Sequence, residues 1–308
     1  MALLFISPDD PAELWRDELT RRMPELDVRI WPETGPPEDV EVALVWRPPA
    51  GALRALPNLK AILSLGAGID GLIADPTLPD VPVAKMVDPS LTRTMSEYVL
   101  ATVLRHHRGL DRFERAQRER RWDYAFPPQA SERRVGIMGQ GELGSDAARV
   151  LRAHGFQVAG WSRTPKEIEG VDSFAGDDGL GPFLARTDIL VCLLPLTAST
   201  RGILGRATFE RLPDHAYVIN AARGAHLVDD ELIAALDGGR LAGATLDVFH
   251  EEPLPGTSPL WAHPKVLITP HVASYCVPSS AAEGVIDNVR RALAGRPLDH
   301  QVDRSRGY

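Results

Sequence analysis

Three clusters of polar residues in the second half of the chain follow short apolar runs and carry side chains suited to acid–base chemistry. Arg223 lies in the first cluster, Glu252 in the second and His271 in the third. A guanidinium can bind a carboxylate through two hydrogen bonds while it polarises an adjacent carbonyl. An imidazole can donate a proton to an oxygen that gains charge, and a nearby carboxylate can orient that ring and favour its protonated form. Together the three residues suit the reduction of a 2-oxo acid.

Each of these residues also has a structural interpretation. An Arg-Gly pair after a strand commonly forms a turn, a glutamate before proline is commonly a surface acid, and a histidine after proline commonly packs at a strand end. Their order along the chain and their position after a glycine-rich turn favour the catalytic interpretation. We predict no metal site, because no His or Cys cluster with metal-binding spacing accompanies them.

The glycine-rich turn contains Gly139, Gly141 and Gly144 in the GxGxxG spacing. An apolar run ending at Met138 predicts a buried parallel strand before the turn, and residues 143–154 predict an amphipathic helix after it. The first glycine permits a tight turn, the second lets backbone approach a pyrophosphate, and the third lets the helix lie close to the strand. The helix N-terminus can then offer N–H groups to anionic oxygens. In this context the motif predicts a dinucleotide-binding site.

The next predicted strand, residues 157–161, ends where an NAD site normally has Asp or Glu to bind the ribose hydroxyls. This chain has Ser162 and Arg163 there, followed by Thr164 and Lys166. A carboxylate would repel a 2′-phosphate, whereas a hydroxyl and a guanidinium can donate hydrogen bonds to it. The sequence therefore predicts that NADP(H) is preferred and that NAD(H) is possible. In the alternative interpretation, Arg163 is a solvated turn residue.

Length and composition bound the class of protein. A chain of 308 residues is long enough for two domains with a cleft between them. The formal net charge of -8 disfavours nucleic acid or an anionic membrane as a partner. Cys192 and Cys276 lack CxxC spacing, which predicts reduced thiols in a cytoplasmic protein. The apolar N-terminal run is too short for a signal peptide, and no stretch has the length of a transmembrane helix.

Short apolar runs alternate with amphipathic segments along the first part of the chain, which predicts a small α/β domain. One helix is expected at residues 11–23, and the expected strands are residues 3–6, 28–31, 42–46, 61–65 and 83–86. A long helical pattern then starts near Thr92 and continues into the charged run 112–121. We interpret it as a connector to the second domain and the charged run as a solvated helix face.

The second domain is expected over residues 99–276, where strands and helices keep alternating. A helix is predicted at residues 229–236, and the later strands are predicted at residues 189–194, 217–220, 244–248 and 266–269. Such alternation predicts a doubly wound parallel sheet, a Rossmann cofactor domain, whose ligands lie at the carboxyl ends of the strands. A last helix at about residues 279–293 is expected to return to the first domain. That domain, residues 1–98 and 277–308, is then a smaller, discontinuous, flavodoxin-like substrate domain.

The setting of Arg223, Glu252 and His271 after the glycine-rich turn resembles the D-isomer-specific 2-hydroxyacid dehydrogenase family, over the whole chain. Within that family the chain looks most like the glyoxylate/hydroxypyruvate reductase A group. The segments that carry this likeness are residues 45–46, 65–70, 161–164, 258–261, 269–273 and 301–308. The resemblance implies NADPH-preferring reduction of glyoxylate to glycolate and of hydroxypyruvate to D-glycerate by a homodimer, with His271 as proton donor.

Further site residues follow from the same resemblance. The substrate residues it implies are Trp46, Ala67, Gly68, Arg223 and His271. The expected cofactor residues include those of the glycine-rich turn and those at the end of the following strand. They are Gly139, Gly141, Glu142, Leu143, Gly144, Ser162, Arg163, Thr164, Lys166, Leu194, Pro195, Thr200, Ala221, Ala222, Arg223, Asp247, His271 and Ala273. A strand running into Gly-Ala-Gly also exposes backbone N–H groups to an anion, although an ordinary glycine turn is the alternative. Trp46 has packing as its alternative, and Arg47 receives no role.

Two other functions fit this sequence. The first keeps the chemistry and changes the substrate to a different or bulkier 2-oxo acid, because one sequence does not place the side chains that set the pocket volume. The second is a nucleotide-binding protein that retains the fold and acts by binding partners. It predicts cofactor binding without turnover.

Overall fold

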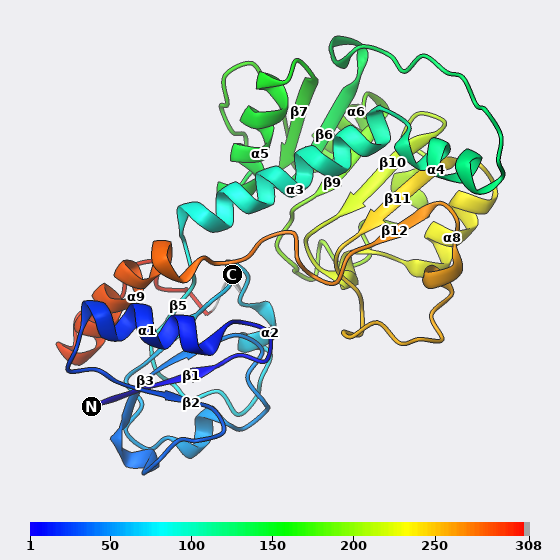
Figure 1. Cartoon of the computed structure of the whole chain (residues 1–308). Coiled ribbons are helices and arrows are strands. Elements are labelled where there is room, and N and C mark those ends of the chain that lie inside the picture. Colours follow the sequence, from blue (N-terminus) through cyan, green and yellow to red (C-terminus); the bar gives the residue numbers. More distant parts are fainter. Residues whose placement is uncertain (305–308) are drawn as a thin grey trace. The chain divides into compact units, whose positions relative to one another are not determined.

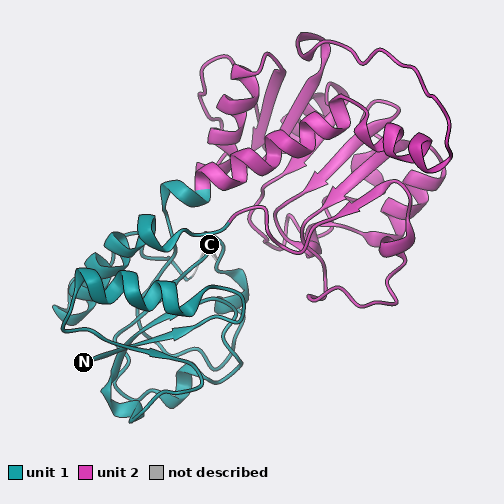
Figure 2. Ribbon diagram, in the orientation of Figure 1, with its two compact units in different colours: residues 1–91, 275–308 teal, residues 92–274 magenta. Residues whose placement is uncertain are grey.

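The structure is a computed structural model that describes residues 1–304, and its chain divides into two compact units (Figure 2). Unit 1 comprises Met1–Leu91 and the chain from Tyr275 onward, and unit 2 comprises Thr92–Ser274. Part of the segment 301–308, which supported the family resemblance, therefore lies outside the described residues.

Unit 1 is built on a five-stranded parallel sheet with strand order β2-β1-β3-β4-β5 (Figure 1). The strands are β1 (Ala2–Ile6), β2 (Asp27–Ile30), β3 (Val40–Val45), β4 (Ala61–Ser64) and β5 (Val83–Ala84). The helices are α1 (Ala12–Arg22), α2 (Asp70–Ile73) and α9 (Pro278–Leu293), with 3-10 turns at Pro37–Asp39 and Leu53–Ala55. This strand order is that of flavodoxin, which confirms the predicted fold of the first domain.

Helices α1 and α9 lie side by side in unit 1 although they stand at opposite ends of the chain (Figure 1). Trp15 and Leu19 of α1 are fully buried, and the Trp15 ring lies 6.3 Å from the ring of Phe5 in β1. The Arg22 guanidinium at the end of α1 donates to the carbonyl oxygen of Ser279 in α9 at 2.9 Å. The last helix thus completes the unit in which the chain begins.

Unit 2 is built on a seven-stranded parallel sheet with order β12-β11-β10-β9-β6-β7-β8. Its strands are β6 (Arg134–Met138), β7 (Gln157–Ser162), β8 (Asp172–Ala175), β9 (Ile189–Cys192), β10 (Ala216–Asn220), β11 (Leu241–Leu246) and β12 (Val266–Ile268). Its helices are α3 (Pro89–His107), whose residues up to Leu91 belong to unit 1, α4 (Leu110–Arg118), α5 (Glu142–Ala153), α6 (Gly176–Ala185), α7 (Arg206–Phe209) and α8 (Asp229–Asp237), with 3-10 turns at Ala130–Glu132, Gly224–His226 and Pro259–Ala262. Counted from β6, this is the Rossmann order extended by one strand, as predicted.

The central strands of unit 2 are mostly apolar because helices cover both faces of the sheet. Successive side chains of a strand point to opposite faces. Ile189 and Val191 of β9 pack in one core cluster with residues of α3 and α5, while Leu190 and Cys192 pack in another with residues of α6 and α8. Because the strands are parallel, their carboxyl ends lie on the same side of the sheet, and the polar clusters follow there.

The connector between the units differs from its prediction. The expected continuous helix from Thr92 to residue 121 is wrong, because Gly109 adopts φ +65° and separates α3 from α4, which ends at Arg118. Met95 and Val99 are buried in the core of unit 2. Unit 2 therefore begins at Thr92, seven residues before the expected boundary at residue 99, and the chain leaves it at Ser274 and not at residue 276.

The edge strand β8 and the following helix α6 were not predicted. Asp172 and Ser173 of β8 are exposed, so the strand has no apolar run, and Pro182 lies inside α6.

Across residues 1–304, no helix combines the length and the apolar character needed to span a bilayer.

Candidate functional site

The glycine-rich turn joins β6 to α5, and two of its glycines are required by geometry. Gly139 has φ +100°, a conformation that side chains with a Cβ rarely adopt. A Cβ on Gly144 would lie 1.9 Å from the carbonyl oxygen of Gly139, so only glycine lets α5 start this close to the turn. A Cβ on Gly141 would meet nothing within 4 Å. Open space therefore faces the N-terminus of α5, which begins without a side-chain cap and fits a pyrophosphate.

Ser162, Arg163 and Lys166, the residues predicted to select NADP(H) over NAD(H), are here called the cofactor selector. They lie at or just after the end of β7, the strand paired with β6, and so lie beside the turn. The Gly139 N–H donates to the Trp161 carbonyl at 2.8 Å, which ties the turn to the end of β7. Ser162 is buried, and its hydroxyl donates to the Thr164 carbonyl at 2.7 Å. Arg163 and Lys166 are exposed. A hydroxyl and two cations thus stand where an NAD site normally has a carboxylate.

The side chains of His271 and Glu252 are in contact, as the sequence suggested. The Nδ1 atom of His271 lies 2.7 Å from Oε2 of Glu252, and the two side chains are 25% and 18% exposed. The other carboxylate oxygen, Oε1, accepts the Phe249 backbone N–H at 2.9 Å, which fixes the carboxylate. His271 itself has φ +57°, an unfavourable conformation for a residue with a Cβ, and such strain is often found at functional sites.

Asp247 holds the backbone around His271. Its carboxylate accepts hydrogen bonds from the Thr269 hydroxyl at 2.6 Å and from the N–H groups of Val272 and Ala273, each at 2.9 Å. Its carbonyl oxygen accepts the His271 N–H at 2.8 Å. Burial raises the pKa of the Asp247 carboxyl above its ordinary value, and the hydrogen bonds that it accepts oppose that shift. Asp247 therefore orders the segment that carries the histidine.

Arg223 lies in a tight turn after β10. Its guanidinium donates to the Ala222 carbonyl at 2.7 Å, and its own carbonyl accepts the Asn220 side-chain amide at 3.0 Å. A Cβ on Gly224 would lie 1.9 Å from the carbonyl carbon of Phe249, so glycine brings this turn against the segment that precedes Glu252. The three polar clusters thus follow the carboxyl ends of β10, β11 and β12, which are adjacent strands in the sheet of unit 2.

A buried histidine links the loops that carry other predicted cofactor residues. His226 Nδ1 lies 3.2 Å from the backbone nitrogen of Arg223, and its Nε2 lies 3.3 Å from the Pro195 carbonyl. Thr200 stabilises the Pro195 loop, since its hydroxyl donates to that same carbonyl at 2.8 Å. Leu194, Ala221 and Ala222 are buried around these contacts. The sequence analysis missed His226, because a lone histidine two residues beyond an Arg-Gly pair has no distinctive pattern.

The predicted substrate residues of unit 1 follow β3 and β4, which are neighbouring strands. Trp46 packs on the next loop, since a Cβ on Gly66 would lie 2.3 Å from its ring. Ala67 and Gly68 are partly exposed beyond that contact. Arg47 has φ +46°, and its guanidinium lies 3.8 Å from the Asp9 carboxylate.

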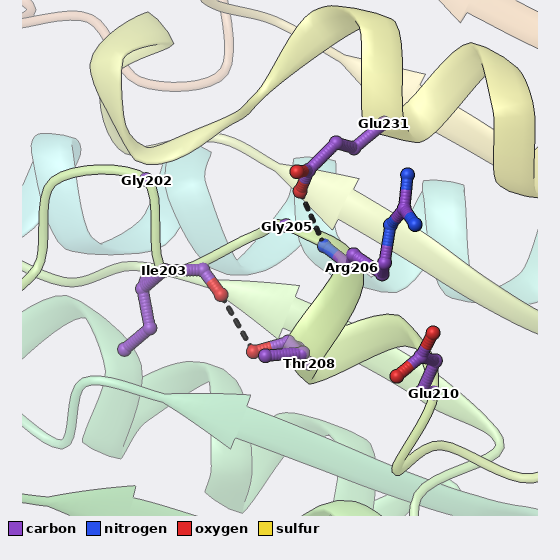
Figure 3. A pocket seen from close by; sticks show the side chains of 8 residues that line it. Gly202, Ile203, Gly205, Arg206, Thr208, Glu210 and Glu231 are labelled. Carbon is purple, nitrogen blue, oxygen red and sulfur yellow. Dashed lines mark hydrogen bonds between the residues drawn. The ribbon is translucent and has the colours of Figure 1, made fainter.

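A hollow of about 320 Å³ lies beside α7 and α8, and no predicted site residue lines it; Figure 3 shows its lining side chains. Its polar groups bind one another: the Glu231 carboxylate accepts the Arg206 backbone N–H at 2.5 Å, and the Thr208 hydroxyl donates to the Ile203 carbonyl at 2.6 Å.

Among residues 1–304, no group of three or more His, Cys, Asp or Glu side chains is placed to hold a metal ion.

Comparison with known proteins gives the class of this site. Residues 100–273 match the model of the D-isomer specific 2-hydroxyacid dehydrogenase NAD-binding domain. The chain is also 42% identical, over the full length of both proteins, to glyoxylate/hydroxypyruvate reductase A of Yersinia enterocolitica. This protein therefore belongs to the D-isomer specific 2-hydroxyacid dehydrogenase family and is an oxidoreductase, which confirms the resemblance seen in its motifs.

Two crystal structures share the whole fold. One is a D-isomer specific 2-hydroxyacid dehydrogenase from Xanthobacter autotrophicus in complex with NADPH and MES, at 50% identity and a TM-score of 0.93, with 100% of this chain and 99% of that one covered. The other is an NADPH-dependent glyoxylate/hydroxypyruvate reductase from Sinorhizobium meliloti in complex with NADP and sulfate, at 38% identity and a TM-score of 0.92, with both chains fully covered.

Proposed function

We propose that this protein is an NADPH-preferring reductase of small 2-oxo acids, which converts glyoxylate to glycolate and hydroxypyruvate to D-glycerate. The observation that carries the proposal is the 2.7 Å contact between His271 Nδ1 and Glu252 Oε2 in the unit that also holds the glycine-rich turn. Relatives named for these two substrates, similar over their full length, support the choice of substrate.

In this proposal His271 supplies the proton and Arg223 binds the substrate. Glu252 engages Nδ1, so the proton passes from Nε2 to the carbonyl oxygen that becomes the hydroxyl. The Glu252 carboxylate orients the imidazole through its contact with Nδ1. The Arg223 guanidinium, which donates to the Ala222 carbonyl, would also bind the substrate carboxylate and polarise its carbonyl. NADPH, when bound, supplies the hydride that adds to C2.

The cofactor would be held by the β6–α5 turn and by the end of β7. The open space at Gly141 receives the pyrophosphate, and the N–H groups of α5 bind its oxygens. Ser162, Arg163 and Lys166 bind the 2′-phosphate, which gives NADPH its advantage over NADH. The remaining expected cofactor residues would line the adenosine and nicotinamide halves: Glu142, Leu143, Thr164, Leu194, Pro195, Thr200, Ala221, Ala222, Asp247 and Ala273.

We assign unit 1 the role of substrate domain. The backbone N–H groups of Ala67 and Gly68 bind the substrate carboxylate, and Trp46 limits the size of the group attached to C2. The ring of Trp46 is already positioned by its packing on Gly66.

We further propose that the protein acts as a homodimer in the cytoplasm. Trp122, Tyr124 and Phe126 lie close together in sequence and are 93%, 73% and 84% exposed. They form an apolar surface that a second copy would cover.

The two cysteines fit the proposed cytoplasmic location. Burial raises the pKa values of Cys192 and Cys276 to about 12, so both stay protonated thiols, as suits a reducing compartment.

Steady-state oxidation of NADPH and NADH with glyoxylate, hydroxypyruvate and pyruvate tests the proposal. We expect NADPH to be consumed faster than NADH, and faster with glyoxylate or hydroxypyruvate than with pyruvate. Equal rates with both cofactors would contradict the role of Ser162 and Arg163. Cofactor binding without turnover on all three acids would contradict the substrate assignment, and would point to a bulkier 2-oxo acid or to a binding function.

A further inference from the structure

Gln140, the residue between the first two glycines of the turn, has a buried side chain that the proposed mechanism does not use. It is 3% exposed. Its amide lies on the neighbouring strand β7, where a Cβ on Gly160 would come within 1.9 Å of Nε2 and 2.2 Å of Cδ. Gly160 thus leaves the space that the amide fills, two residues before Ser162.

The amide also reaches the cofactor selector. Its Oε1 lies 3.4 Å from the hydroxyl oxygen of Ser162, while that hydroxyl already donates to the Thr164 carbonyl at 2.7 Å. Among residues 1–304, Nε2 of Gln140 is buried without a hydrogen-bond partner. A buried N–H donor that is unpaired costs free energy, and few proteins retain one without a use.

A half-turn of the amide plane exchanges Oε1 and Nε2 without changing the shape of the side chain. Nε2 then takes the position 3.4 Å from the Ser162 oxygen and can donate to it. A serine hydroxyl accepts hydrogen bonds while it donates one. With a lone pair bound by Gln140, Ser162 no longer donates to the amide, and its single proton can turn from the Thr164 carbonyl to an anionic oxygen.

We infer that Gln140 is a positioning residue for cofactor selectivity: its amide orients the Ser162 hydroxyl toward the 2′-phosphate of NADPH. The inference rests on the proposed preference for NADPH. It makes the glycine-rich turn contribute to the choice between the two cofactors as well as to binding the pyrophosphate they share.

The test measures dissociation constants of NADPH and NADH by the change in nicotinamide fluorescence, without substrate. Gln140→Leu keeps the volume above Gly160 and removes the amide. We expect it to weaken NADPH binding about tenfold, the effect of a hydrogen bond to a charged network, and to change NADH binding less than about twofold. Ser162→Ala should lose a similar part of the preference, and Gln140→Leu added to Ser162→Ala should lose no more.

Gly181→Ala is the matched control in the same unit, because a Cβ there meets nothing within 4 Å, and it should bind both cofactors as the wild type does. The inference is overturned if Gln140→Leu weakens NADPH and NADH equally, as a purely structural role requires, or if its effect is unchanged in the Ser162→Ala background. Wild-type protein that binds both cofactors equally would overturn it together with the proposed preference. Selective binding without turnover would leave it standing and refute the proposed reaction alone.

Discussion

Replacing His271 by glutamine is expected to lower kcat about 10³-fold and to leave the dissociation constant of NADPH within about twofold of the wild type. Glutamine preserves a polar side chain of similar reach, but its amide cannot give up a proton at neutral pH. The wild-type ring is held by Glu252 at 2.7 Å, and Glu252 is itself held by the Phe249 N–H. The loss should therefore fall on the proton-transfer step and not on binding of the cofactor.

The measurement is steady-state turnover with saturating hydroxypyruvate, together with a fluorescence titration of NADPH. His215→Gln is the matched control, because His215 also has a positive φ, +63°, lies in unit 2 and is exposed. It should retain wild-type kcat. Turnover of the His271 variant within about tenfold of the wild type would remove His271 from the mechanism.

Replacing Arg223 by lysine is expected to lower kcat/KM for the 2-oxo acid about 10³-fold, with contributions from both constants. Lysine keeps the positive charge but has no planar fork, so it cannot bind both carboxylate oxygens and polarise the carbonyl at once. It also loses the bond from the guanidinium to the Ala222 carbonyl that fixes the direction of the side chain.

Initial rates over a range of glyoxylate and hydroxypyruvate concentrations separate KM from kcat in this variant. Arg206→Lys provides the comparison, since Arg206 lies in the same unit beside the hollow of Figure 3 and outside the proposed site. We expect no change for Arg206→Lys. If Arg223→Lys retained kcat/KM within about threefold, a point charge would suffice and the bidentate role would be refuted.

Much of unit 2 could be predicted from local pattern because its sheet is parallel and covered on both faces. Such strands are short apolar runs that are easily recognised, and Gly139 and Gly144 mark the β6–α5 turn through steric needs that are local in sequence. Exposed β8 lacks that signal. The break between α3 and α4 depends on the left-handed conformation of Gly109, which a helical pattern of polar and apolar residues does not reveal.

The sequence supplied candidate residues for the site but not the network of contacts between them. His271 and Glu252 could be paired from their types and order. The contacts that hold them depend on distant segments: the Tyr98 hydroxyl lies 2.7 Å from that of Thr269, 171 residues further along the chain, and Thr269 donates to Asp247. Burial raises the pKa of Tyr98, which keeps it a neutral hydroxyl in this chain of hydrogen bonds. No spacing in the sequence predicts such a contact, because it arises only when α3 packs on the sheet.

The most direct test of the central claim is to follow deuterium from NADPH labelled at the transferable C4 position into the product. The protein is incubated with labelled NADPH and hydroxypyruvate, and the product is analysed by NMR and by chiral chromatography. Hydride transfer at this site predicts D-glycerate with deuterium at C2, one for each NADPH oxidised. Product without deuterium at C2, or NADPH that remains unoxidised beside hydroxypyruvate, would contradict the proposed reaction.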